Sequence, residues 1–189
     1  MATGYSIKVG DIEVRTSEAL YQACRFPNSL DVQKMIIEQK SPMMAKMKSK
    51  PFRPKTRPDW DMVKVKIMQW CIRAKLACNY YKFRDLLLST GDKSIVEDSH
   101  RDRFWGAISQ EDGSLVGENV LGRLLMELRE ELKVDKMNNL KKVQPLKIND
   151  FNLLGHPIPI IGINDDCNKI IEKEEKDKKL RQLQLFNKE

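Results

Sequence analysis

Two pairs of polar and aromatic side chains in this sequence stand at helical spacing. Glu18 and Gln22 stand four positions apart in a segment that predicts a helix, so both extend from one face of it. Trp60 and Lys64 have the same spacing farther along, which puts an aromatic ring one helical turn from an amine. A carboxylic acid with a raised pKa can donate a proton, and a neutral amine can attack carbon. Taken singly, each pair also fits a solvated helix face or a packed core.

A third group of reactive side chains is concentrated in ten residues, 97–106, whose sequence is EDSHRDRFWG. Acidic, basic and aromatic side chains alternate there, and Asp102 stands three residues before Trp105 and four before Gly106. Because functional residues often lie on loops that a rigid scaffold positions, this segment is a candidate part of a site.

The segment between these groups is strongly basic. Residues 40–84 hold 13 Lys or Arg and two acidic residues, a net charge of +11, and residues 46–57 hold six cations and no acid. Such a run is either a solvated surface loop or a surface that faces phosphate, and composition alone leaves both open. Four prolines predict that the segment is extended or looped rather than a basic helix: Pro42, Pro51, Pro54 and Pro58.

Length and composition bound the class of protein. The chain has 189 residues, a formal charge of +7, 41% hydrophobic and 32% charged residues, which is typical of a folded domain with an appendage. No apolar run reaches the about 18 residues of a membrane span, and the N-terminus has no signal-peptide pattern, so we expect a cytoplasmic protein without a membrane partner. The four cysteines are scattered and only two histidines are present, which predicts reduced thiols, no metal and no cofactor.

The elements that must position these groups are mostly helical. Alternation predicts two short strands in residues 5–15 around a Gly10-Asp11 turn, and another strand at 94–97. Helical spacing of apolar residues predicts helices at 18–25, 30–39, 59–76, 80–89 and 119–132. The fold class expected is α+β, mainly helical, with a small sheet. The main domain is expected to span residues 1–132, followed by an accessory extension at 133–189 that ends in a charged helix at 167–188.

The order of the motifs resembles the NADAR (YbiA-like) family across about residues 6–132. The motifs that carry the resemblance are TSEALYQ (16–22), SPMMAK (41–46), DWDMVKVKIM (59–68), RAK (73–75), LLLSTGD (86–92), VED (96–98), DRFWG (102–106) and GENVLGRLLMELR (117–129).

This resemblance implies an N-glycosidase that acts on ribose-linked nitrogen. Some members are associated with riboflavin-pathway intermediates, and others resemble DarG-type antitoxins, which remove ADP-ribose from guanine in DNA and so reverse DarT-type toxins. The basic segment favours the second branch here, with ADP-ribosylated guanine in DNA and a DarT-type toxin as partners. The catalytic residues implied are Lys64, Asp102 and Glu18, and the substrate-binding residues are Trp60, Trp105, Gln22, Gly106, Asn119 and Lys75.

A chemical hypothesis follows for these residue types. Lys64 attacks the anomeric carbon of the ribose, the opened sugar forms a Schiff base, and water hydrolyses it. Desolvation or the neighbouring Lys66 can lower the pKa of such a lysine. Glu18 or Asp102 protonates the leaving nitrogen or the ring oxygen, the tryptophans stack on the bases, and Lys75 is the competing nucleophile.

Three alternatives remain open from the sequence. The chain can be an N-glycosidase of small riboflavin-pathway nucleotides, or a non-catalytic reader of ADP-ribose. It can also hold a toxin directly through residues 134–189, in which case deletion of that segment is expected to abolish the function while an enzyme needs little of it.

Overall fold

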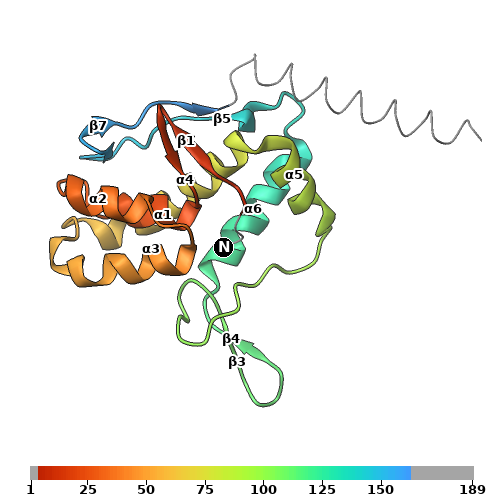
Figure 1. The fold of residues 1–189 in the computed structure, drawn as a ribbon. Coiled ribbons are helices and arrows are strands. Elements are labelled where there is room, and N and C mark those ends of the chain that lie inside the picture. Colours follow the sequence, from red (N-terminus) through yellow and green to blue (C-terminus); the bar gives the residue numbers. More distant parts are fainter. Residues whose placement is uncertain (1–3, 163–189) are drawn as a thin grey trace, which may run out of the picture.

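The computed structural model describes residues 4–162, whose helices and short two-stranded sheets are drawn in Figure 1. The α-helices are α1 (Ser17–Ala23), α2 (Leu30–Ile37), α3 (Pro42–Ser49), α4 (Trp60–Cys78), α5 (Tyr80–Ser89) and α6 (Val120–Val134), and the 3-10 helices are η1 (Lys50–Lys55) and η2 (Asn139–Lys141). The strands are β1 (Ile7–Val9), β2 (Ile12–Val14), β3 (Ile108–Ser109), β4 (Leu115–Val116), β5 (Lys142–Val143), β6 (Asn152–Leu153), β7 (His156–Pro157) and β8 (Ile161–Gly162). The mainly helical α+β class is confirmed.

The N-terminal hairpin forms as the alternating pattern predicts. β1 pairs antiparallel with β2, with Ile7 opposite Val14, and both side chains are fully buried. Gly10 adopts a φ of 58° in the turn, a backbone conformation that glycine reaches at little cost. Thr16 then caps α1, because its Oγ1 accepts a hydrogen bond from the backbone N–H of Ala19 at 3.1 Å.

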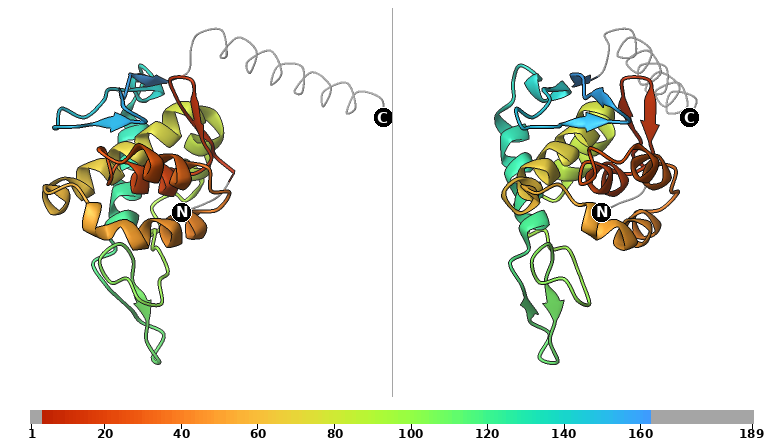
Figure 2. Two further views of the ribbon diagram at one scale, coloured as in Figure 1. Left: turned by 60° about the vertical axis from the view of Figure 1, so that its left-hand side comes forward. Right: turned by 90° about the vertical axis from the view of Figure 1, so that its left-hand side faces the viewer.

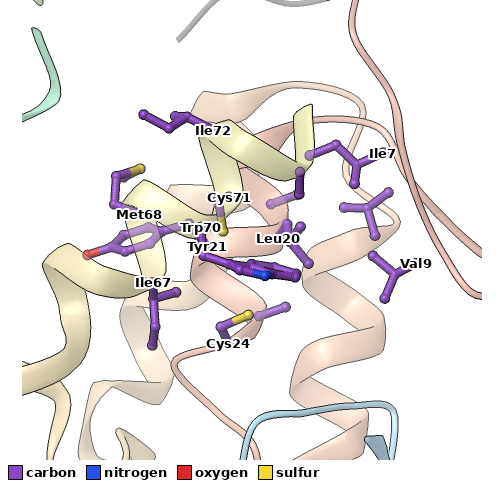
Figure 3. Close-up of a cluster of buried hydrophobic side chains, with 14 of the residues drawn as sticks. Ile7, Val9, Leu20, Tyr21, Cys24, Ile67, Met68, Trp70, Cys71 and Ile72 are labelled. Carbon is purple, nitrogen blue, oxygen red and sulfur yellow. The ribbon is translucent and has the colours of Figure 1, made fainter. Parts of the chain in front are cut away.

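The hydrophobic core lies where β1, α1 and α4 meet (Figure 3). Leu20 of α1 and Ile67 of α4 are fully buried, and Cys24 and Cys71 come from the same two segments. Burial raises the pKa of the Cys71 thiol well above its ordinary value. Cys24, Cys71 and Cys78 form no disulfide within residues 4–162.

The basic segment corrects one expectation, because residues 42–49 form α3 and residues 50–55 form η1. Pro42 occupies the first turn of α3, where a missing backbone N–H costs nothing, and Ser41 Oγ accepts the Met44 N–H at 3.2 Å. Pro51 and Pro54 fall in the short 3-10 helix rather than in the middle of an α-helix. The prolines set the ends and the type of these helices and do not exclude them.

The strand predicted at residues 94–97 is also wrong. The segment is irregular, and the nearest pairing is an isolated bridge between Asp98 and Ala107. Its backbone bonds instead to one side chain: Asn119 Oδ1 accepts from Glu97 N at 3.0 Å, and Asn119 Nδ2 donates to Ile95 O at 2.9 Å. A side chain 22 residues away therefore takes the hydrogen bonds that a neighbouring strand would take.

Residues 134–162 pack against the rest of the chain along α4 (Figure 2). β5 pairs with β8 and β6 with β7, and Phe151, Leu153, Ile158 and Ile161 are buried in the same core cluster as α1 and α4. Trp70 of α4 donates its indole N–H to Gln144 O at 2.9 Å, and its ring lies 4.8 Å from that of Phe151.

Gln33 of α2 holds the β6–β7 segment in place through hydrogen bonds to Asn152 and Leu154. Its side chain has no exposed area, its Nε2 donates to Ala23 O and Asn152 O, and its Oε1 accepts from Leu154 N at 2.7 Å. A buried amide is stable only when its polar atoms are bonded, so Gln33 joins α1, α2 and the β6–β7 hairpin.

Two expectations concern the C-terminal part of the chain. The charged helix predicted at 167–188 lies outside the described residues, and the division at residue 133 stays a prediction. No helix among residues 4–162 is long and apolar enough to span a membrane.

Candidate functional site

A cavity of about 340 Å³ opens between α1, α3, η1, the first half of α4 and the 97–106 loop. Its volume is in the range of small-ligand pockets. Seven of the predicted site residues line it: Glu18, Gln22, Trp60, Lys64, Asp102, Trp105 and Gly106. Residues from three distant parts of the sequence are therefore brought together as expected.

One stripe of α1 and its C-terminal extension forms one wall. Glu18, Tyr21, Gln22 and Arg25 line the cavity, and their positions i, i+3, i+4 and i+7 share one helical face. Tyr21 and Arg25 were missed by the sequence reasoning, although both fall on the helical face that Glu18 and Gln22 share.

A short hydrogen-bond chain fixes the carboxylic acid of this wall. Gln22 Nε2 donates to Glu18 Oε1 at 2.9 Å, and Ser49 Oγ of α3 donates to Gln22 Oε1 at 2.9 Å. Gln22 and Ser49 are buried, so each partner limits the rotation of the next. Ser49 was also missed, because its contact with Gln22 arises only when α3 packs on α1.

Burial raises the pKa of Glu18, although the hydrogen bond from Gln22 and the charge of Lys46 act in the opposite direction. A raised pKa favours the protonated form of a carboxylic acid, which can donate its proton to a substrate. Glu18 therefore has the environment of a general acid.

The first half of α4 supplies the amine. Trp60, Lys64 and Met68 line the cavity at intervals of four residues. Lys64 Nζ lies 2.8 Å from Asp61 Oδ1 and 4.7 Å from the ring centroid of Phe104. The Asp61 side chain is 88% exposed, so this ion pair lies at the solvent edge, where a substrate can displace it. Lys66, in contrast, is exposed and does not line the cavity.

Aromatic rings cover one side of the cavity. Tyr21 lies between the two tryptophans, with ring centroids 5.1 Å from Trp60 and 5.5 Å from Trp105. The Arg25 guanidinium lies 5.1 Å from the Trp60 ring centroid, and its Nε donates to Thr56 Oγ1 at 2.8 Å. Burial lowers the pKa of Arg25. These rings offer flat apolar surfaces on which a nucleobase can stack.

Asp102 is held in a tight turn of the 97–106 loop. Its Oδ1 accepts from the backbone N–H groups of Phe104 at 3.2 Å and Trp105 at 2.9 Å, and its own N–H donates to Ser99 Oγ at 2.9 Å. Its Oδ2 lies 3.5 Å from Lys46 Nζ. The two carboxylate oxygens thus face backbone N–H groups and a lysine, and the side chain lies where it can face positive charge on a substrate.

Gly106 lines the cavity for a steric reason. A Cβ at this position would lie 2.3 Å from Glu97 O, so no other residue fits without moving the loop. Its N–H donates to Asp102 O at 3.3 Å, so this amide is used within the loop.

Asn119 and Lys75 do not line the cavity. Asn119 holds the 95–97 backbone through its side-chain amide, and its own N–H donates to Gly106 O at 3.2 Å. It therefore positions the loop that carries Asp102. Lys75 is buried, with Nζ 4.4 Å from the ring centroid of Tyr5 and 4.2 Å from that of Phe83, and burial lowers its pKa to about 8.

Cations line the mouth of the cavity. Lys46 of α3 and Lys50 and Arg53 of η1 contribute to the lining, and all three are exposed. They belong to the basic segment identified in the sequence. Together with the acid on α1, the amine on α4 and the aromatic rings, they form a site suited to a ribose that carries phosphate and a base. No cluster of metal-ligating side chains occurs in residues 4–162.

Comparison with known proteins identifies the same part of the chain. The family model described as the NADAR domain matches residues 2–133. The N-glycosidase YbiA of Escherichia coli strain K12 is 35% identical over 132 residues, which cover 70% of this chain and 79% of that protein. An NMR structure of the E. coli protein YbiA has a TM-score of 0.59 at 34% identity and covers 71% of this chain and 77% of that one.

Two further relatives are much longer proteins. The riboflavin biosynthesis protein VVA0006 of Vibrio vulnificus is 34% identical over 125 residues, which are 66% of this chain and 32% of the relative. The chloroplastic riboflavin biosynthesis protein PYRR of Zea mays is 36% identical over 126 residues, 62% of this chain and 19% of the relative. The chain thus spans a third or less of these two.

Proposed function

The chain belongs to the NADAR domain family, and from that premise we propose that it is an N-glycosidase that removes ADP-ribose from guanine bases in DNA. The observation that carries the proposal is the meeting of three groups in one cavity: the Glu18 acid, the Lys64 amine and a cationic mouth. An N-ribosyl bond needs a proton for its leaving group and stabilisation of the sugar cation, and a phosphorylated ribose needs cations.

The names of the relatives support the reaction class. YbiA is named an N-glycosidase, and its similarity extends over the residues that form the cavity. The chain is an N-glycosidase on this reasoning, and the finer choice of substrate depends on the surface around the cavity.

Lys64 is the proposed nucleophile. Its neutral Nζ attacks C1 of the ribose, the bond from C1 to the guanine nitrogen breaks, and the opened sugar remains as a Schiff base on Lys64. Water then adds to the C=N bond, which restores the lysine and releases ADP-ribose. Asp61, 2.8 Å from Nζ, is in position to pass the proton of the lysine to solvent before the attack.

Glu18 is the proposed general acid and Asp102 the proposed electrostatic stabiliser. The raised pKa of Glu18 favours its protonated form, which can protonate the ring oxygen or the leaving nitrogen. Asp102 accepts two backbone N–H groups and faces a lysine, so its negative charge is positioned to stabilise the cationic Schiff base.

The surroundings of the cavity favour a nucleic-acid substrate over a free nucleotide. Lys46, Lys50 and Arg53 open toward a surface that is basic well beyond the cavity. A DarT-type toxin is the proposed source of the modified guanine, and an antitoxin-like role in the cytoplasm is part of the same proposal.

The test uses an oligonucleotide that carries ADP-ribose on guanine. Wild-type protein is expected to release free ADP-ribose and leave intact DNA, whereas Lys64→Ala releases none. Addition of borohydride during turnover is expected to trap a covalent sugar adduct on Lys64 of the wild type, detected by peptide mass spectrometry. An adduct on another lysine overturns the role of Lys64, and tight binding without release by wild type identifies a reader instead.

Small riboflavin-pathway nucleotides are the second candidate substrates. The names of the Vibrio and maize relatives favour them, and a cavity of about 340 Å³ is large enough for one nucleotide. Initial rates on both substrates at equal concentration decide between them: faster release of ribose phosphate from the small nucleotide favours this second candidate.

A further inference from the structure

The surface beside the cavity has cations without acidic partners. Lys48, Lys50, Arg53 and Lys55 are exposed, and none of them forms an ion pair within residues 4–162. Lys46, which lines the cavity, instead has an acidic partner in Asp102 at 3.5 Å. A group of cations that repel one another without compensation lowers the energy of a bound polyanion.

The same surface exposes apolar side chains. Met43, Met44 and Met47 of α3 are 70%, 40% and 51% exposed, while Ala45 and Ser49 of the same helix are buried against the body. α3 lies at the outside of the molecule in the views of Figures 1 and 2. Its outer face therefore alternates methionines with lysines instead of carrying the usual charged surface alone.

This mixture suits one kind of polyanion. The phosphates of single-stranded DNA can meet the lysines, and its unstacked bases offer aromatic faces that the polarizable methionine sulfur contacts favourably. Duplex DNA keeps its base faces covered and would leave the methionines in water. The observed composition therefore favours a single strand.

The surface is continuous with the cavity. Lys50 and Arg53 belong to the unpaired cations and also line the cavity mouth, and Lys46 of α3 does so as well. A strand that lies on α3 and η1 is thus led to the mouth of the cavity that Lys64 also lines.

We infer that α3 and η1 form a binding track for single-stranded DNA, which holds the strand so that its modified guanine enters the cavity. This inference rests on the proposed function and extends it to the part of the substrate outside the ADP-ribose. Lys48 and Lys55 belong to the track but do not line the cavity, so they separate strand binding from chemistry.

The experiment compares two double variants with equal charge change. Lys48→Gln/Lys55→Gln removes two cations of the track, and Lys136→Gln/Lys142→Gln removes two exposed cations from the segment that follows α6. Binding of an unmodified fluorescent single strand is measured by anisotropy over a range of KCl concentrations. The track variant is expected to bind about tenfold more weakly and to lower the salt slope by about 1.4, since each lost phosphate contact changes it by about 0.7. The control variant should match wild type.

A second variant tests the apolar part. Met43→Ser/Met47→Ser is expected to weaken binding of the single strand severalfold without a change in the salt slope, and to leave duplex binding unchanged. Equal binding of single strand and duplex by wild type overturns the inference, as does an unchanged salt slope in the track variant.

Activity assays separate this inference from the proposed function. For the track variant, kcat/KM on the ADP-ribosylated oligonucleotide is expected to fall about tenfold and to stay at the wild-type value on ADP-ribosylated guanosine. Parallel losses on both substrates overturn the track. If wild type releases no ADP-ribose from either substrate, the proposed function fails, and the salt dependence of strand binding still decides whether the track exists.

Discussion

The two halves of α4 carry the same residue types and use them differently. In the first half, Trp60 and Lys64 line the cavity, where the ring packs at a tilt against Tyr21 and the amine pairs with an exposed aspartate. In the second half, Trp70 and Lys75 are 2% and 3% exposed. There the indole N–H bonds to Gln144 O and the amine lies against two aromatic rings.

This difference shows that residue type and helical spacing do not determine the role of a side chain. The pKa of Lys75 is lowered to about 8 by burial, a change often associated with nucleophilic lysines, yet Lys75 lies outside the cavity. Lys75 has a lowered pKa but does not line the cavity, whereas Lys64 does. Access to a substrate is the requirement that comes first, because an amine must touch the carbon that it attacks.

The largest expected effect on the contrast between the two halves of α4 concerns catalysis by their lysines, Lys64 and Lys75. Lys64→Arg keeps the charge but removes the primary amine that forms a Schiff base, so kcat should fall by at least about 10³-fold. Lys75→Met should keep kcat close to the wild-type value. Initial rates of ADP-ribose release measure both, and the opposite order would assign the nucleophile to the second half of α4.

The next effect concerns the acid that faces the first half of α4. An acid works while it holds its proton, and the pKa of Glu18 is raised by burial. Activity should therefore persist below that raised pKa and decline as the pH rises through it. Glu18→Gln should lower kcat about 10²-fold and remove this alkaline decline from the pH profile. Asp102→Asn is the control: it should lower the rate and keep the decline, and a profile that is unchanged in Glu18→Gln would exclude Glu18 as the acid.

The pH dependence of stability tests the second half of α4. The pKa of Lys75 is about 8 in the folded protein against an ordinary value of 10.5, so between these pH values the unfolded chain binds more protons. The free energy of unfolding should therefore rise with pH in this window, by about 2–3 kcal/mol from pH 7 to pH 10 relative to Lys75→Met. Urea unfolding of both proteins at the two pH values measures the difference. Parallel pH dependence in the two proteins would contradict it.

The smallest effect distinguishes the two tryptophans. Trp70→Phe removes the indole N–H from Gln144 O and leaves a small void, so it should lower the free energy of unfolding by about 1–2 kcal/mol. Its kcat/KM should not change. Trp60→Phe should instead raise KM with a smaller loss of stability. If both variants change stability alone, or both change KM alone, the contrast between Trp60 and Trp70 is wrong.

Much of the fold could be predicted from the sequence, because its helices and first hairpin follow from patterns within short stretches of the chain. Apolar spacing predicts α1, α2, α4, α5 and α6 within a few residues, and the alternating pattern predicts the β1–β2 hairpin. The two errors have physical reasons: Pro42 fits the first turn of α3, and residues 94–97 bond to the distant Asn119 side chain. Neither reason is visible in a short window of sequence.

Less of the candidate site could be predicted from the sequence. Family motifs identified seven of the lining residues. The order of motifs does not show whether a residue lines the cavity, so Lys75 and Asn119 were included with them. Ser49 was missed because its contact with Gln22 depends on how α3 packs on α1. Contacts of this kind are set by tertiary packing, which spacing along one helix does not contain.

The hydrogen bonds of Gln33 also bear on how such a chain can evolve. The family match ends at residue 133, but the amide of this residue bonds to Asn152 and Leu154, and Phe151 and Ile161 are in the common core. A chain shortened at residue 133 would leave these polar atoms without partners and uncover apolar surface. We therefore expect that the part matched by the family model cannot be transplanted or trimmed without residues 134–162, because the two parts share one core.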